Sequence, residues 1–86
     1  MAAVYVERRR FVAKTLSERP WCEARFDGCT GRSESVNELI RRSHNGARYP
    51  GEPNRRENVY HSLCNRCHDA ITVNSLWAKE NGWEQT

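Results

Sequence analysis

The sequence predicts a small α+β fold. Its hydrophobic core is small, so we expect a disulfide or metal cross-link to contribute to its stability. The chain has 86 residues, of which 37% are hydrophobic and 29% are charged. A chain of this length buries only about 60–65% of the surface that it exposes when unfolded. Helix-like and strand-like segments alternate along it, and it contains four cysteines. Because so small a domain needs a staple, the cysteines are the first candidates for that role.

The N-terminal part predicts a helix followed by a knuckle. Residues 5–17 carry Phe11 and Leu16 on an apolar stripe among charged residues, which is typical of an amphipathic helix. Pro20 ends this helix. Residues 21–32 contain the turn dipeptides Asp-Gly and Thr-Gly, so we expect a knuckle or hairpin there and no helix.

The middle of the chain predicts two short strands and a helix. The strands are expected over residues 35–40 and 58–63, and the helix over residues 64–72. Residues 41–57 lie between the strands and are rich in Arg, Gly, Pro and Asn. Structureless loops of that length are usually functional or disordered.

The C-terminal part predicts a last short helix, which Asn74 or Ser75 caps and Gly82 ends. No internal repeat divides the chain. We therefore expect a single domain over residues 1–86, with an N-terminal helix at 1–18, a knuckle and strand–strand–helix core at 19–72 and a helical tail at 73–86.

The spacing of the four cysteines predicts a structural zinc site. Cys64 and Cys67 form a C-x2-C pair where a strand meets a helix, and the first helical turn folds the second sulfur back toward the first. Cys22 and Cys29 complete a set of four thiolates. Such a site contributes on the order of 10 kcal/mol to folding. The alternatives are two disulfides, or a haem attached through C-x-x-C-H, which would leave the first two cysteines without a role.

The sequence lacks the apolar segments that would direct the chain to a membrane or out of the cell. The chain has no apolar run of the roughly 18–20 residues that span a membrane, and no apolar region of a signal peptide. We therefore expect the protein to be in the cytoplasm, where disulfides are rare.

The charge of the chain is uneven. Residues 1–68 have a net charge of +5 and residues 69–86 one of −2. Of the 14 basic residues 12 are arginine, which binds phosphate in a bidentate fork and so favours DNA as a partner.

His68 follows the second cysteine of the C-x2-C pair directly. Successive side chains on a helix point roughly 100° apart, so His68 is not expected to share the zinc of Cys67. It is expected to face the strand pair, where it can bind a second cation or a phosphate.

About three quarters of the chain resembles the small HNH endonucleases of phages and bacteria. The resemblance is carried by R-P-W-C at 19–22, C-T-G-R at 29–32, V-N-E-L-I-R-R-S at 36–43 and N-V-Y-H-S-L-C-N-R-C-H at 58–68. It implies a ββα-metal unit with a zinc held by four cysteines, and phage packaging or replication proteins as further partners. It also implies that His68 is the metal ligand on the helix and that Asn58 is the middle Asn, whose side chain orders the loop between the strands.

The first strand departs from the family's pattern. The family carries His or Asp followed by His there, and some members carry His followed by Glu. This chain has Asn37 and Glu38. Asn37 offers a neutral carbonyl oxygen, and Glu38 can bind the cation or accept the proton of the attacking water. His44 and His61 remain open as alternative bases.

The resemblance implies that the chain nicks DNA by metal-dependent hydrolysis. The predicted catalytic residues are Glu38, Asn58 and His68, and the predicted ligands of the divalent cation are Asn37, Glu38 and His68. The cation is expected to be Mg2+ or Mn2+, with Zn2+ or Ni2+ as alternatives. The alternative function is an impaired HNH-like zinc module that only binds DNA or a protein. In both cases the expected contacts to the DNA backbone come from Arg41, Arg42, Arg48, Arg55 and Arg56.

Overall fold

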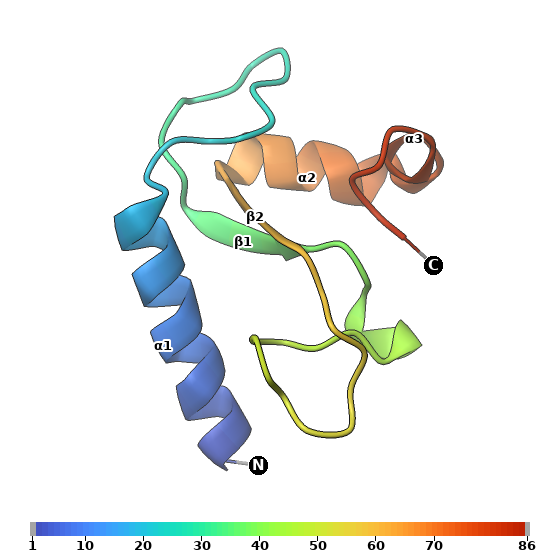
Figure 1. The fold of residues 1–86 in the computed structure, drawn as a ribbon. Coiled ribbons are helices and arrows are strands. Elements are labelled where there is room, and N and C mark those ends of the chain that lie inside the picture. The colour runs from blue at the N-terminus through green and yellow to red at the C-terminus, as the bar shows by residue number, and fades with distance from the viewer. Residues whose placement is uncertain (1, 86) are drawn as a thin grey trace.

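The computed structural model describes residues 2–85, in which three α-helices lie around a two-stranded antiparallel sheet (Figure 1). The predicted small α+β fold is thus confirmed, while the predicted domain limits at residues 1 and 86 lie outside the described residues. The elements are α1 (Ala2–Glu18), β1 (Ser35–Glu38), the 3-10 turn η1 (Arg42–His44), β2 (Tyr60–Leu63), α2 (Asn65–Val73) and α3 (Ser75–Glu80).

The two strands are shorter than the sequence predicts, and the side chain of Asn58 explains why. The ladder pairs Ser35 with Leu63 and Glu38 with Tyr60. Beyond it, the backbone N–H and C=O of Ile40 bond to the side-chain amide of Asn58 at 2.8 Å each. Because these groups are already satisfied, regular pairing with a second backbone ends before Ile40.

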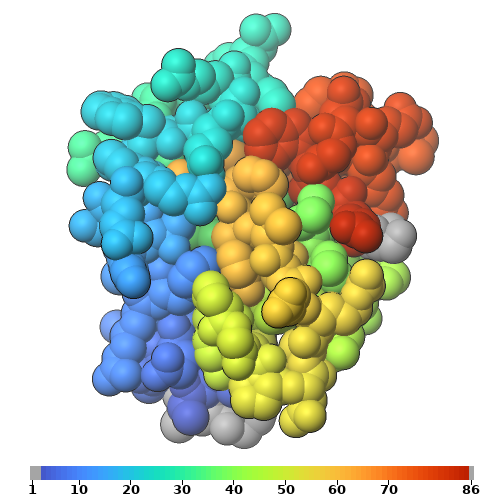
Figure 2. All heavy atoms as spheres, viewed as in Figure 1, coloured from blue at the N-terminus to red at the C-terminus, as the bar shows by residue number. Residues whose placement is uncertain are grey.

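Helix α1 lies alongside the sheet and is longer than predicted, since it begins at Ala2 (Figure 1). Phe11 packs edge-on against Tyr60 of β2, with ring centroids 4.5 Å apart, and Thr15 is buried. On the face shown in Figure 2, β2 lies between α1 and the C-terminal helices. The packing of α1 therefore depends on one stripe of its surface, as its sequence pattern predicts.

The core lies under α2 and consists largely of cysteine. Its buried members are Cys22, Leu63, Cys64, Cys67, Ile71 and Ala78, and Phe26 and Trp83 pack against them. Phe26 stands edge-on to Trp83, with centroids 5.4 Å apart. Three of the six buried members are cysteines, so the core and the cysteine cluster share the same residues.

The segment between the strands is ordered, although the sequence predicts a structureless loop over residues 41–57. Its buried carboxylate, Glu52, accepts a hydrogen bond of 2.7 Å from the backbone N–H of Arg48 and one of 2.9 Å from its guanidinium. Gly46 forms a bridge with Arg56. An internal ion pair thus closes the loop, which sequence periodicity does not reveal. None of the described helices is long and apolar enough to cross a membrane.

Candidate functional site

The four cysteines form one cluster that could hold a metal ion such as zinc. The Sγ atoms of Cys22, Cys29, Cys64 and Cys67 all lie within 4.8 Å of one another, and those of Cys29 and Cys64 are 3.8 Å apart. Tetrahedral zinc with bonds of about 2.3 Å separates its sulfurs by about 3.8 Å, whereas a disulfide needs about 2.05 Å. All four cysteines are free thiols, so the structure has neither of the two predicted alternative disulfides. A haem bound through Cys64 and Cys67 would leave Cys22 and Cys29 without a role, whereas the cluster includes both of them.

The surroundings of the cluster act on Cys64 and Cys67 in opposite directions. Cys64 is the N-cap of α2, and its sulfur accepts the N–H of Cys67 at 3.4 Å. Burial opposes ionisation of Cys64, but bonds from Cys67 and Thr30 outweigh it and lower the pKa of its thiol to about 6. Burial raises the pKa of Cys67 to about 12. A bound cation would hold both thiols in the ionised form despite the raised pKa of Cys67, since coordinated thiols are deprotonated.

A second candidate site lies where β1 meets α1, α2 and the C-terminal tail. The structure has a hollow of about 260 Å³ there. The hollow brings together all three predicted cation ligands with three arginines. It is lined by Arg8, Val36, Asn37, Glu38, Arg41, Arg42, His68 and Glu84.

His68 faces β1, as its position on the helix predicts, and it lies outside the cysteine cluster. The Oγ of Ser35 lies 2.9 Å from its Nδ1. This bond fixes the ring and leaves Nε2 as the nitrogen available to a ligand. Burial lowers the pKa of His68, although Asp69 and Glu38 oppose the shift. Burial thus favours the neutral imidazole, which is the form that binds metals.

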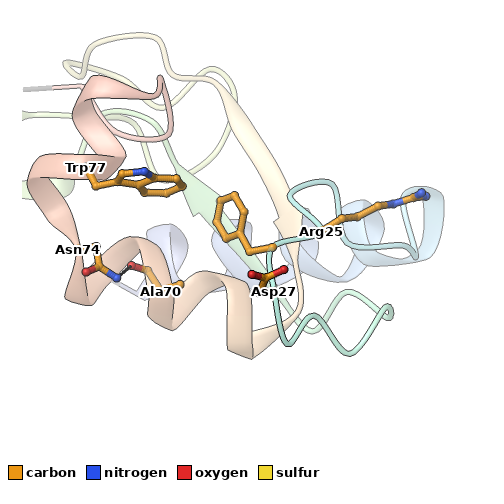
Figure 3. Close-up of a pocket in the computed structure, with 6 residues that line it drawn as sticks. Arg25, Asp27, Ala70, Asn74 and Trp77 are labelled. Carbon is orange, nitrogen blue, oxygen red and sulfur yellow. Dashed lines mark hydrogen bonds between the residues drawn. The ribbon is translucent and has the colours of Figure 1, made fainter.

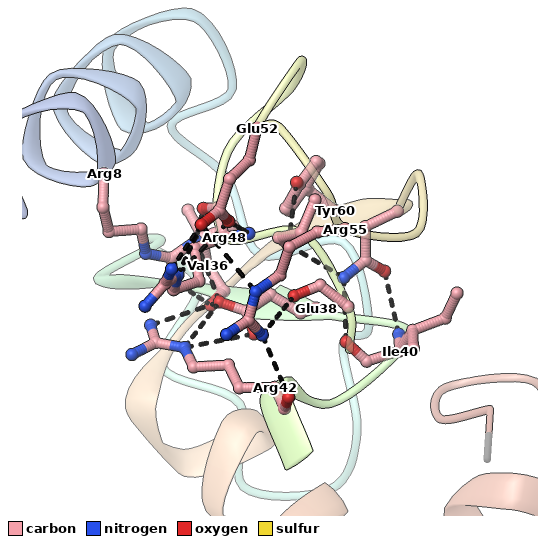
Figure 4. Close-up of polar contacts among 12 residues, drawn as sticks. Arg8, Val36, Glu38, Ile40, Arg42, Arg48, Glu52, Arg55 and Tyr60 are labelled. Carbon is pink, nitrogen blue, oxygen red and sulfur yellow. Dashed lines mark hydrogen bonds and ion pairs between the residues drawn. The ribbon is translucent and has the colours of Figure 1, made fainter. Parts of the chain in front are cut away.

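Glu38 lies between two guanidinium groups (Figure 4). Its Oε1 is 3.1 Å from Nη1 of Arg8 and 3.2 Å from Nη2 of Arg42. Only 10% of the side chain is exposed. The carboxylate that the sequence assigns to the cation or to the water is thus paired with two arginines from different elements.

Asn37 is buried and bonds to the C-terminal tail. Its Nδ2 donates to the carbonyl oxygen of Trp83 at 3.0 Å, and its backbone pairs with His61 in the ladder. The amide nitrogen therefore joins β1 to the tail. Asn37 lines the hollow, and its role as a ligand stays a prediction.

Asn58 makes four hydrogen bonds with its side chain. Besides the two to Ile40, its Nδ2 donates to the carbonyl of Ala47 and its Oδ1 accepts the N–H of Val59, both at 3.0 Å. Gly46 is required beside it, because a Cβ at Gly46 would come within 2.0 Å of the oxygen of Ile40. Asn58 thus orders the loop from outside the hollow, and its catalytic assignment stays a prediction.

The two alternative bases do not line the hollow. His44 is exposed on η1. His61 packs edge-on against Trp83 with centroids 5.0 Å apart, and burial lowers its pKa. Its position is that of a packed strand residue, and Glu38 is the candidate base that faces the hollow.

Most of the arginines predicted to bind DNA are paired within the protein. The carboxylates of Glu38, Glu52 and Glu84 each lie between two basic side chains, so each group retains one positive charge. Arg56 is exposed and has no carboxylate partner among residues 2–85. The groups are Arg8 and Arg42 at Glu38, Arg48 and Arg55 at Glu52, and Arg41 and Lys79 at Glu84.

Two charged residues of the hollow, Arg8 and Glu84, are not among the predicted site residues. The first lies in a run of three arginines, and its position three residues before Phe11 puts it on the packed stripe of α1, whereas Arg9 and Arg10 are exposed. The second accepts bonds from Arg41 and Ser75. Burial opposes ionisation of Glu84, but these two donors outweigh it and hold its pKa below the usual range.

A larger hollow of about 550 Å³ lies between the knuckle and the helices α2 and α3 (Figure 3). Phe26 stands edge-on to Trp77 with centroids 5.2 Å apart. The side-chain nitrogen of Asn74 donates to the carbonyl of Ala70, and Arg25 points away from Trp77 (Figure 3). The lining includes one carboxylate, Asp27, and no His or Cys. It lacks the groups that phosphodiester chemistry needs.

Comparison with known proteins adds no assignment. No family model, no curated protein and no solved structure matches the chain. The geometry of the cysteine cluster and of the smaller hollow is therefore the basis for a functional proposal.

Proposed function

We propose that the protein is a metal-dependent HNH-type endonuclease that hydrolyses DNA phosphodiester bonds, with a structural zinc in the cysteine cluster. The observation that carries the proposal is the smaller hollow, which joins Glu38 and His68 to arginines of two segments, α1 and the start of η1. A carboxylate, a neutral imidazole and guanidinium groups are what a cation and a scissile phosphate require together. The ββα-metal interpretation of β1, β2 and α2 rests on this site.

The donors present suit a cation that keeps part of its water. Glu38 supplies a carboxylate oxygen and His68 an imidazole nitrogen, and Mg2+ and Mn2+ are commonly held by few protein ligands. A bound cation would supply charge stabilisation for the phosphate and the leaving oxygen. Glu38 would accept the proton of the attacking water, and Arg41 and Arg42 would position the phosphate.

A plasmid-nicking assay of the zinc-loaded protein with Mg2+ or Mn2+ tests the proposal. We expect nicking by the wild type and a loss of at least about 100-fold in His68→Ala, since even second-shell changes at metal sites cost about 10–100-fold. Val73→Ala is the matched control, because it lies on the same helix and is 79% exposed. Wild-type rates in His68→Ala would overturn the assignment of the site.

A second function is favoured by the contacts of Asn37 and Glu38. Asn37 is bonded to the C-terminal tail and Glu38 is paired with two arginines. Because both side chains already have partners within the protein, the arrangement also suits a zinc module that binds DNA without cutting it. That function predicts DNA binding that weakens steeply with salt, with no strand breaks in any divalent metal. Nicking that depends on His68 excludes it.

A further inference from the structure

The two arginines beside Glu38 are held very differently. Arg8 comes from α1 and only 17% of its side chain is exposed, whereas 54% of the side chain of Arg42 is exposed. Both face the same carboxylate (Figure 4). Their different surroundings indicate different roles.

Arg8 is fixed by the backbone as well as by the ion pair. Its Nη1 donates to the carbonyl of Arg48 at 2.8 Å, and its Nη2 donates to that of Val36 at 3.3 Å. Two carbonyls and a carboxylate thus hold one guanidinium group. Moving Arg8 would leave these carbonyls without a donor in a partly buried place, which is unfavourable.

The side chain of Arg42 bonds to Glu38 alone among residues 2–85. Its three contacts with the carboxylate are long, at 3.2, 3.3 and 3.4 Å. Because 54% of the Arg42 side chain is exposed, water can solvate this guanidinium when it leaves Glu38, and Arg8 still pairs with the carboxylate. Arg42 can therefore leave Glu38 without disturbing the fold, and it lines the same hollow.

We infer that Arg42 is an exchangeable counter-ion of Glu38, which a divalent cation replaces at the carboxylate and which then binds the phosphate of the incoming DNA. Arg8 stays in place and positions Glu38. This inference rests on the proposed function, because it takes the hollow as the site of both cation and phosphate. It predicts that Arg42 competes with the cation when no DNA is present.

Binding of Mn2+ to the zinc-loaded protein without DNA tests this competition, with free Mn2+ measured by electron paramagnetic resonance. In Arg42→Gln we expect the Kd for Mn2+ to fall about fivefold, because a competing positive charge is removed from the carboxylate of Glu38. Arg42→Lys keeps the charge and should stay near the wild type. Arg32→Gln makes the same change of charge beside Trp21, 5.9 Å from its ring, and should also leave the Kd unchanged.

The outcomes separate this inference from the proposed function. If the wild type nicks DNA but Arg42→Gln binds Mn2+ no more tightly, the inference is wrong and the function stands. If Arg42→Gln binds Mn2+ more tightly and no variant nicks DNA, the counter-ion role stands and the function is wrong. Equal tightening in Arg32→Gln, or no Mn2+ binding by any variant, overturns the inference.

Discussion

Asn58 shows how one side chain ends two strands and orders the loop between them. We expect Asn58→Ala to lower the free energy of unfolding by about 2–3 kcal/mol, because it leaves the buried backbone groups of Ile40 and Ala47 without partners. Denaturant unfolding of the zinc-loaded protein measures this. Asn65→Ala serves as the control, since Asn65 is exposed on α2. A loss at position 58 no larger than at position 65 would contradict the role.

At the scale of elements, the segment between the strands depends on Glu52. The bond from Arg48 lowers the pKa of this carboxyl despite its burial. A lowered pKa contributes stability that is fully present above the ordinary pKa of Glu and is lost only as the pH falls through the lowered value. We therefore expect Glu52→Gln to lower Tm by about 5 °C and by the same amount at pH 8 and pH 6.

Thermal unfolding followed by circular dichroism measures this difference. Glu57→Gln is the control in the same segment, because Glu57 is exposed, and it should leave Tm unchanged. A difference that fades between pH 8 and pH 6, or an equal effect at Glu57, would show that the ion pair does not hold the segment.

For the whole molecule, the cysteine cluster joins the knuckle to α2 within the core. We expect one Zn2+ per chain, and loss of both zinc and cooperative unfolding in Cys67→Ser, since structural zinc contributes on the order of 10 kcal/mol and a domain is stable by only about 5–15 kcal/mol. Elemental analysis and unfolding curves measure this.

A comparison of two cysteine variants separates metal binding from packing. Cys67 is fully buried, whereas Cys29 is half-buried. A packing role predicts a mild effect for Cys29→Ser and a large one for Cys67→Ser. Metal binding predicts that both variants lose zinc and stability together.

The local patterns of the chain determined the order of helices and strands, the set of four cysteines and the direction of His68. Each depends on spacing along one element: a C-x2-C pair at the start of a helix, and the turn of about 100° from Cys67 to His68. Such relations are fixed by backbone geometry before any tertiary contact forms.

Only the tertiary structure decided the surroundings of Glu38 and Asn37. Arg8 lies 30 positions before Glu38, and Trp83 lies 46 positions after Asn37. No periodicity links residues so far apart, because the rotation of α1 and the path of the tail are set by packing. The sequence therefore determined the candidate cation ligands of the site, Asn37, Glu38 and His68, and the fold decided which further charges join them and which charges neutralise one another.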